Sequence, residues 1–229
     1  MKKIENQNMK ANLLQLKELA NKKVTSAISK KIELIIESLH DRQDFARYHF
    51  YEYKDVMHTL NNDKLKIEQA LQINNKNKKD AIAIKANITA CMQNIHITHD
   101  ILAYLIATVL NLDLNEREIS FVKVKEKSSS FINLKKLLED FSGHNDYKYL
   151  ISYSNHTKHR FHIDSKLTFH FTQDKHYTAI FEKFSFKGNS YTEQAIESFL
   201  VREFNREQKL IIAIENELIN ILQMQDEDN

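Results

Sequence analysis

Seven consecutive residues, from Ser154 to Arg160, bring together one carboxamide, two imidazoles and two cations. Asn155 and His159 are four residues apart, so they share a face if the stretch is helical. A histidine can exchange a proton with a ribose hydroxyl or a leaving oxygen, and Lys158 and Arg160 can hold phosphate. The stretch therefore indicates either a site for a polyanion or a polar helix end that is hydrogen-bonded to a neighbouring helix.

A second polar group, His96, His99 and Asp100, interrupts a long apolar segment. His96 lies three residues before His99 and four before Asp100, and both spacings place side chains on one face of a helix. Helical bundles use such spacings for inward-facing metal ligands, and a mononuclear site completed by His159 is one interpretation. The other is a hydrogen-bonded pair that joins two helices, in which Asp100 orients a histidine.

The Ser154–Arg160 stretch is similar to the signature of the HEPN superfamily of all-helical proteins. That signature is Arg, a polar residue, three to five further residues and His, and most often Arg-Asn-x-x-x-His. Asn155 and His159 match its Asn and His, whereas Ser154 stands where the Arg belongs. A divergent pattern of HEPN-like bundles, Asn-x-x-Lys-His-Arg, is matched by Asn155, Lys158, His159 and Arg160.

The resemblance covers residues 25–222 in helix order, and it implies a bundle that binds RNA or nucleotides. Members with the full signature are metal-independent ribonucleases that act as homodimers in toxin–antitoxin or phage-defence systems. Ser154 cannot supply the charge that positions the scissile phosphate, so the resemblance predicts binding and leaves cleavage open. It implies Asn155 and His159 as catalytic candidates, Lys158, Arg160, His96 and Asp100 as ligand-binding candidates, and no cofactor or metal.

A second Arg–His pair, Arg42 and His49, formally fits the same signature. Both residues fall on the apolar side of an expected helix, where a charge needs a partner or a wet cavity. Asp100 is a candidate partner for Arg42. Because Arg and His are common in this chain, we interpret the spacing as chance.

The elements that position these groups are predicted to be mainly α-helical, because the chain has no proline and only two glycines, Gly143 and Gly188. We expect a helical bundle with two long antiparallel helices in a single domain, residues 1–229. The apolar spacing predicts helices over residues 9–20, 26–60, 80–112, 131–141 and 146–159, a polar loop over 74–79, and an undecided segment over 119–124.

The pattern changes after residue 160, where apolar and polar residues alternate over 166–171 and again over 177–186. Alternation of this kind predicts a β-hairpin over about 166–187, inserted before the last helix. Its aromatic residues could stack bases, but more often they form the inner face of a hairpin packed on helices. Ser190 and Glu193 have the spacing of a capping box and predict the start of the last helix.

Composition narrows the possible functions further. The 33 Lys and Arg nearly balance 31 Asp and Glu, so nucleic-acid binding requires a local basic surface. With two glycines, neither a Walker loop nor a Rossmann turn can be built. A single Cys91, no apolar leader and no membrane-length apolar run predict a cytoplasmic protein without membrane contact. The alternative function is a non-enzymatic helical scaffold or partner-binding protein, in which the polar cluster is structural.

Overall fold

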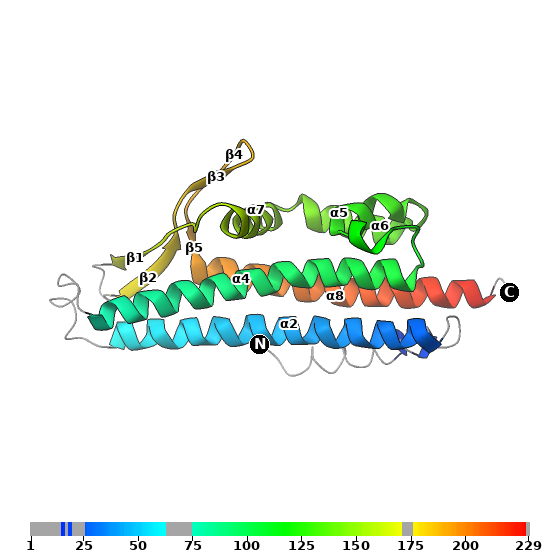
Figure 1. Ribbon diagram of the computed structural model, residues 1–229, viewed down its shortest axis with the longest axis horizontal. Coiled ribbons are helices and arrows are strands. Elements are labelled where there is room, and N and C mark those ends of the chain that lie inside the picture. Colours follow the sequence, from blue (N-terminus) through cyan, green and yellow to red (C-terminus); the bar gives the residue numbers. More distant parts are fainter. Residues whose placement is uncertain (1–14, 17, 20–25, 63–74, 171–175, 228–229) are drawn as a thin grey trace. The chain divides into compact units, whose positions relative to one another are not determined.

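The structure is a computed structural model that describes residues 15–16, 18–19, 26–62, 75–170 and 176–227 (Figure 1). The first predicted helix, over residues 9–20, lies mostly outside the described residues. Three long helices dominate the rest: α2 (Ser26–Asn62), α4 (Asn75–Val109) and α8 (Ile196–Glu227). None of them contains Gly or Pro, which confirms the expectation drawn from composition.

Two contacts show that α2 and α4 run antiparallel. Lys31 Nζ lies 4.7 Å from the centre of the Tyr104 ring, and His49 Nδ1 lies 2.9 Å from Asn87 Oδ1. As α2 advances from residue 31 to 49, its partners on α4 fall from 104 to 87. The prediction of two long antiparallel helices in a mainly α fold is therefore confirmed, as Figure 1 also shows.

Shorter elements connect α4 to the strands. The 3₁₀ turn η2 (Glu116–Glu118) precedes α5 (Phe121–Lys127), and η3 (Ser128–Ser130) precedes α6 (Ile132–Gly143). The next helix, α7 (Asn145–His159), begins after a break at His144, as the sequence predicts. The undecided segment at 119–124 resolves as the start of α5, where the Ser120 hydroxyl accepts a hydrogen bond from the Lys123 amide at 3.3 Å.

The strands form two small antiparallel sheets. The first has the order β1–β2–β5, with β1 (Ser165–His170), β2 (His176–Phe181) and β5 (Gln194–Ala195). The second pairs β3 (Phe184–Phe186) with β4 (Asn189–Tyr191). The turn that joins β3 to β4 has φ values of 50° at Lys187 and 80° at Gly188, which suit the two central positions of a type I′ hairpin turn.

Three details of the predicted elements are wrong. Residues 74–79 are not all loop, because α4 begins at Asn75. The second predicted strand, 177–186, is two strands that belong to different sheets. The last helix begins at Ile196 rather than near Ser190, because Ser190 pairs with Ser185 across β3 and β4, so that strand pairing takes the place of the predicted cap.

The chain forms two compact units, each assembled from separate segments. Unit 1 takes the chain up to Arg42, Ile97–His144 and the chain from Asn205 on, and unit 2 takes Gln43–His96 and Asn145–Phe204. The helices α2, α4 and α8 each contribute residues to both units. The prediction of one domain over residues 1–229 stays a prediction.

Unit 2 has a core rich in aromatic residues. Tyr149 on α7 lies 4.9 Å from Phe199 and 6.0 Å from Phe181, and Phe181 lies 4.9 Å from Tyr153, measured between ring centres. Phe181 is fully buried, so β2 packs its aromatic side chain on the helices rather than offering it to a ligand. Among the described residues, no helix is long and apolar enough to cross a membrane.

Unit 1 has a largely aliphatic core that encloses titratable side chains. Leu102, Leu138 and Ile211 are fully buried there. His99 and Glu207 are also buried, with exposed fractions of 1% and 0%, and His99 Nε2 lies 3.6 Å from Glu207 Oε1. The His99 ring meets the edge of Phe141, and the Arg206 guanidinium lies 3.9 Å from the centre of the same Phe141 ring.

Candidate nucleic-acid interface

The Ser154–Arg160 stretch forms the C-terminal end of α7, in unit 2. The Arg160 amide donates to the His156 carbonyl at 2.9 Å and closes the last turn of this helix. One side of α7 is buried by Tyr149, Leu150 and Tyr153. The spacing of an α-helix places Asn155 and His159 together on another side.

The structure separates the residues of this stretch by exposure. Lys158, His159 and Arg160 are exposed, and Asn155 is half-buried. Ser154, which takes the place of the signature Arg, is only 2% exposed and belongs to the buried side of α7. The position of the missing arginine therefore faces the protein interior, and a cation for the surface has to come from Lys158 or Arg160.

His156 anchors this end of the helix. It is 4% exposed, and its Nδ1 donates a hydrogen bond to the Phe161 carbonyl at 3.0 Å, which fixes the proton on Nδ1. Its ring meets the edge of the Phe161 ring at 4.4 Å and lies 5.9 Å from both Phe184 and Phe186. His156 therefore holds the β3–β4 hairpin against the end of α7.

These contacts assemble a surface from α7, the residues that follow it and the hairpin turn. Phe161 remains 71% exposed although it contacts His156. Lys187 lies in the turn, with its Nζ 5.5 Å from the centre of the Phe186 ring. We call this the basic–aromatic surface; it consists of Lys158, His159, Arg160, Phe161 and Lys187.

Some cations of unit 2 are held in ion pairs, whereas others, including Lys148 and Lys183, form none within the described residues. Lys54 pairs with Glu197, Lys85 with Asp164, and Lys166 with Glu193. Within the described part of the chain, by contrast, Lys158, Arg160 and Lys187 form no ion pair. Their charge is available to a phosphate, even though the whole chain is nearly neutral.

His162 follows the surface and has a distinct environment. Burial and the nearby Lys85 ammonium lower its pKa from the ordinary value of 6.5, and Asp164 opposes this shift. Asp164 has a lowered pKa of its own, because Lys85 donates a hydrogen bond to its carboxylate. His162 is therefore uncharged near neutral pH and can accept a proton there.

The other predicted site residues lie on the long helices. His96 is half-buried and Asp100 exposed on α4, and Asp100 belongs to unit 1. We therefore do not include them in the basic–aromatic surface. No group of three metal-ligating side chains within the described residues is placed to share an ion, so we do not propose the metal site that was one interpretation of His96, Asp100 and His159.

The two residues of the second Arg–His pair belong to different units. His49 bonds to Asn87 and so joins α2 to α4, while Arg42 belongs to the other unit. The pairing of His49 agrees with the interpretation that its spacing to Arg42 is chance.

Three contributors to the surface were not predicted from the sequence: His156 as an anchor, Phe161 and Lys187. Phe161 directly follows the last cation of the stretch, and an aromatic residue next to a group of cations is a sequence signal that could have identified it. Lys187 could not have been found in this way, because only the packing of the hairpin on His156 brings it to α7.

Comparison of the chain with protein-family models, with curated proteins and with solved structures gives no match. The function is therefore inferred from the geometry and from the residues that carry the HEPN-like pattern.

Proposed function

We propose that this protein is a divergent HEPN-like protein that binds single-stranded RNA or nucleotides through the basic–aromatic surface. The single observation that carries the proposal is that, among the described residues, Lys158, Arg160 and Lys187 form no ion pair and belong to the same surface as the exposed Phe161. Proteins that bind single strands combine a cationic track for the backbone with aromatic side chains on which bases stack. A role in bacterial defence or in a toxin–antitoxin pair follows from the resemblance alone.

The residues of the surface have separate roles in this proposal. Lys158 and Arg160 hold phosphate, Arg160 in the bidentate manner that a guanidinium allows. Phe161 stacks on a base, and His159 donates to a phosphate or ribose oxygen. Cleavage is not part of the proposal, because the buried Ser154 leaves the arginine position of the signature without a charge.

Fluorescence anisotropy with a labelled RNA of about 12 nucleotides tests this proposal. We expect Lys158→Ala with Arg160→Ala to weaken binding at least about tenfold. The slope of log K against log salt should fall by about 1.4, because two phosphate contacts are lost. A matched control, Lys136→Ala with Lys209→Ala, removes two exposed cations of unit 1 and should leave affinity nearly unchanged.

A cleavage assay in the presence of EDTA uses the same RNA with wild type and His159→Ala. Intact RNA with both proteins, together with tight binding by wild type, agrees with the proposal. Equal binding by wild type and the Lys158/Arg160 double variant would refute it. RNA cutting by wild type that is lost in His159→Ala would add a ribonuclease activity to the binding function.

The second candidate function is partner binding by a helical scaffold, and one observation favours it. Three aromatic residues on the unit 2 part of α2 are exposed: Phe45 by 48%, Tyr48 by 58% and Tyr51 by 47%. They are spaced three residues apart along the helix. We propose a second copy of the chain as the partner. Light scattering should then show a dimer that Phe45→Ser with Tyr48→Ser converts to a monomer, and a monomeric wild type would exclude it.

A further inference from the structure

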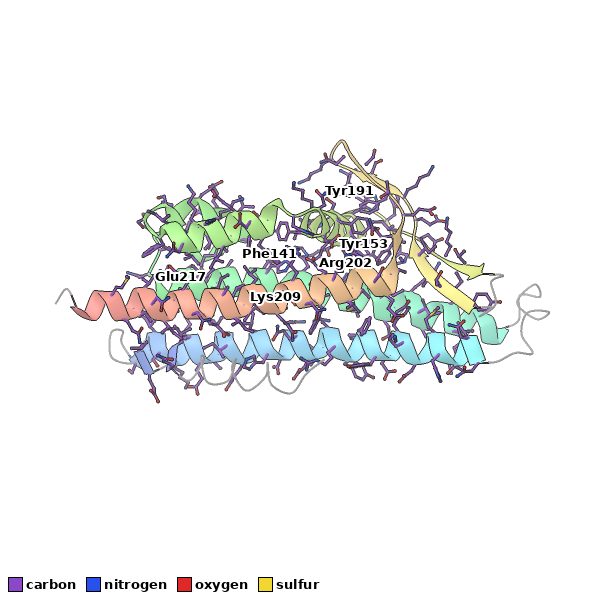
Figure 2. All side chains as sticks on the ribbon, turned by 180° about the vertical axis from the view of Figure 1, so that it is seen from behind. Phe141, Tyr153, Tyr191, Arg202, Lys209 and Glu217 are labelled. Carbon is purple, nitrogen blue, oxygen red and sulfur yellow. The ribbon has the colours of Figure 1, made fainter. Side chains whose placement is uncertain are left out.

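A cavity of 540 Å³ lies between α7 and the strands β4 and β5, all in unit 2. This volume falls in the range of about 300–1,000 Å³ that is typical of small-ligand sites. Three aromatic residues, Tyr147, Tyr149 and Tyr191, line it, and Figure 2 shows Tyr191 on the hairpin. Amide and hydroxyl side chains form much of the remaining wall: Asn145, Ser152, Asn189, Ser190, Thr192 and Gln194.

The Tyr149 side chain indicates that the wall is chemically incomplete. Tyr149 is 4% exposed, and its hydroxyl makes no hydrogen bond to any residue that the structure describes. Buried polar groups in proteins almost always bond to protein, water or ligand. By contrast, the Tyr191 hydroxyl is satisfied by the Ser152 hydroxyl at 2.6 Å. The hydroxyl itself is shielded from solvent, so a group bound in the cavity would reach it only after neighbouring side chains move.

The lining of the cavity includes one paired carboxylate, one exposed cation and a flat aromatic wall. Its one carboxylate, Asp146, is held by the Arg202 guanidinium through contacts of 3.1 and 3.3 Å. Lys148 is the only cation among the lining residues and is exposed. The Tyr191 ring is stacked on Phe184, with centres 4.8 Å apart and planes at 18°, which provides a fixed flat wall. Such a wall, edged by amides and hydroxyls, suits a planar heterocycle.

The cavity and the proposed phosphate-binding residues share helix α7. Ser152 lines the cavity, and Asn155 and His159 follow three and seven residues later along α7. Seven residues of helix span about 10 Å, which is a distance of a few nucleotides. A strand whose phosphates contact Lys158 and Arg160 can therefore place a neighbouring base at the cavity.

We propose that this cavity receives one nucleobase and gives the protein a base preference, an inference that rests on the proposed RNA binding. Asn189 and Gln194 would read the edge of the base, since amides offer a donor and an acceptor side by side. The Tyr149 hydroxyl would bond to the same base after neighbouring side chains move. The basic–aromatic surface would supply affinity for any sequence, while the cavity would supply the preference.

The experiment compares the affinities of the three homopolymers of adenosine, uridine and cytidine, each of about 12 nucleotides. We expect wild type to favour one of them by at least about tenfold, the discrimination of one good amide–base pair. Asn189→Ala with Gln194→Ala should bring the three affinities within about twofold of one another. The Lys158/Arg160 double variant should weaken all three equally. An unchanged preference in the folded Asn189/Gln194 variant would overturn the proposal.

A second measurement separates this inference from the proposed function. Saturation-transfer NMR with the four free nucleosides needs no phosphate contact. Nucleoside signals that appear with wild type and disappear in the Asn189/Gln194 variant would support the cavity, even if no oligonucleotide binds. A lack of oligonucleotide binding would then refute only the basic–aromatic surface. Oligonucleotide binding without base preference or nucleoside signals would refute the cavity and leave the surface intact. Thermal unfolding of each variant confirms that it is folded.

Discussion

The two polar clusters that stand out in the sequence have different surroundings in the two compact units. Unit 1 buries His99 and Glu207 together in its core, where the His99 ring also contacts Phe121 and Phe141. Unit 2 buries aromatic residues, leaves Lys158, His159 and Arg160 exposed, and has a cavity lined largely by amides and hydroxyls. The sequence alone does not distinguish the buried histidine of unit 1 from the exposed histidine of unit 2. The difference teaches that a cluster of titratable residues has to be judged by what it faces.

The largest expected effect concerns the buried charges of unit 1. Glu207→Ala would leave His99 in the core without its carboxylate, and breaking a buried pair costs about 3–5 kcal/mol of unfolding free energy. Urea denaturation measures this loss. Glu217→Ala, on the same helix α8 but half-buried, is the control and should change stability by less than about 0.5 kcal/mol. A small loss in Glu207→Ala would mean that the pair adds little to the core.

A second prediction tests unit 2 through its exposed aromatic residue. Phe161→Ala should weaken RNA binding by about 1–3 kcal/mol, the usual worth of one base–aromatic stack. Because Phe161 is 71% exposed, its loss should barely alter stability. Ile132→Ala removes an apolar side chain of unit 1 that is 78% exposed and should leave RNA binding unchanged. Equal RNA binding by wild type, Phe161→Ala and Ile132→Ala would show that Phe161 does not contribute to RNA binding.

A third prediction concerns the cavity. Tyr149→Phe removes a buried hydroxyl that has no partner among the described residues. The ligand-free protein should therefore gain up to about 1 kcal/mol of unfolding free energy. The same change should weaken binding of the preferred nucleoside. Tyr51→Phe, whose side chain is 47% exposed, is the control and should alter neither quantity. Denaturant titration with and without nucleoside measures both effects, and a less stable Tyr149→Phe variant would indicate an internal partner for the hydroxyl.

The smallest expected effect is a pH dependence at His162. Its folded-state pKa lies below 6.5, so the unfolded chain binds a proton more readily as the pH falls through 6.5. This residue therefore favours folding most above pH 6.5, and its contribution is lost as the pH falls toward the folded-state pKa. His162→Gln should flatten that part of the stability profile, measured by urea denaturation between about pH 5.5 and 7.5. A profile of unchanged slope would contradict the assignment.

Much of the fold follows from local properties of the chain. The lack of proline and the periodic apolar residues predict α2 and α4, because helix formation depends on neighbours within one or two turns. The polar start of α4 at Asn75 was missed for a related reason. A helix, once formed, extends through polar residues at the gain of one hydrogen bond per residue, without needing an apolar face.

The pairing of strands could not be predicted in the same way. Ser190 and Glu193 fit a capping box, yet Ser190 pairs with Ser185 and Tyr191 with Phe184. Strand pairs depend on partners that local spacing does not identify, and a match to a short motif does not outweigh them. The Lys187–Gly188 turn was the local signal for this second hairpin.

The sequence by itself determined a mainly helical protein with a concentrated group of cations and imidazoles at residues 154–160, because propensity and residue chemistry are local. Only the tertiary structure decided that Ser154 and His156 face inward while Lys158, His159 and Arg160 face outward. It also decided that Lys187 and Phe186 join them and that Tyr149 and Tyr191 line a cavity. Burial and proximity depend on which distant segments pack together, and that information is spread over the whole chain.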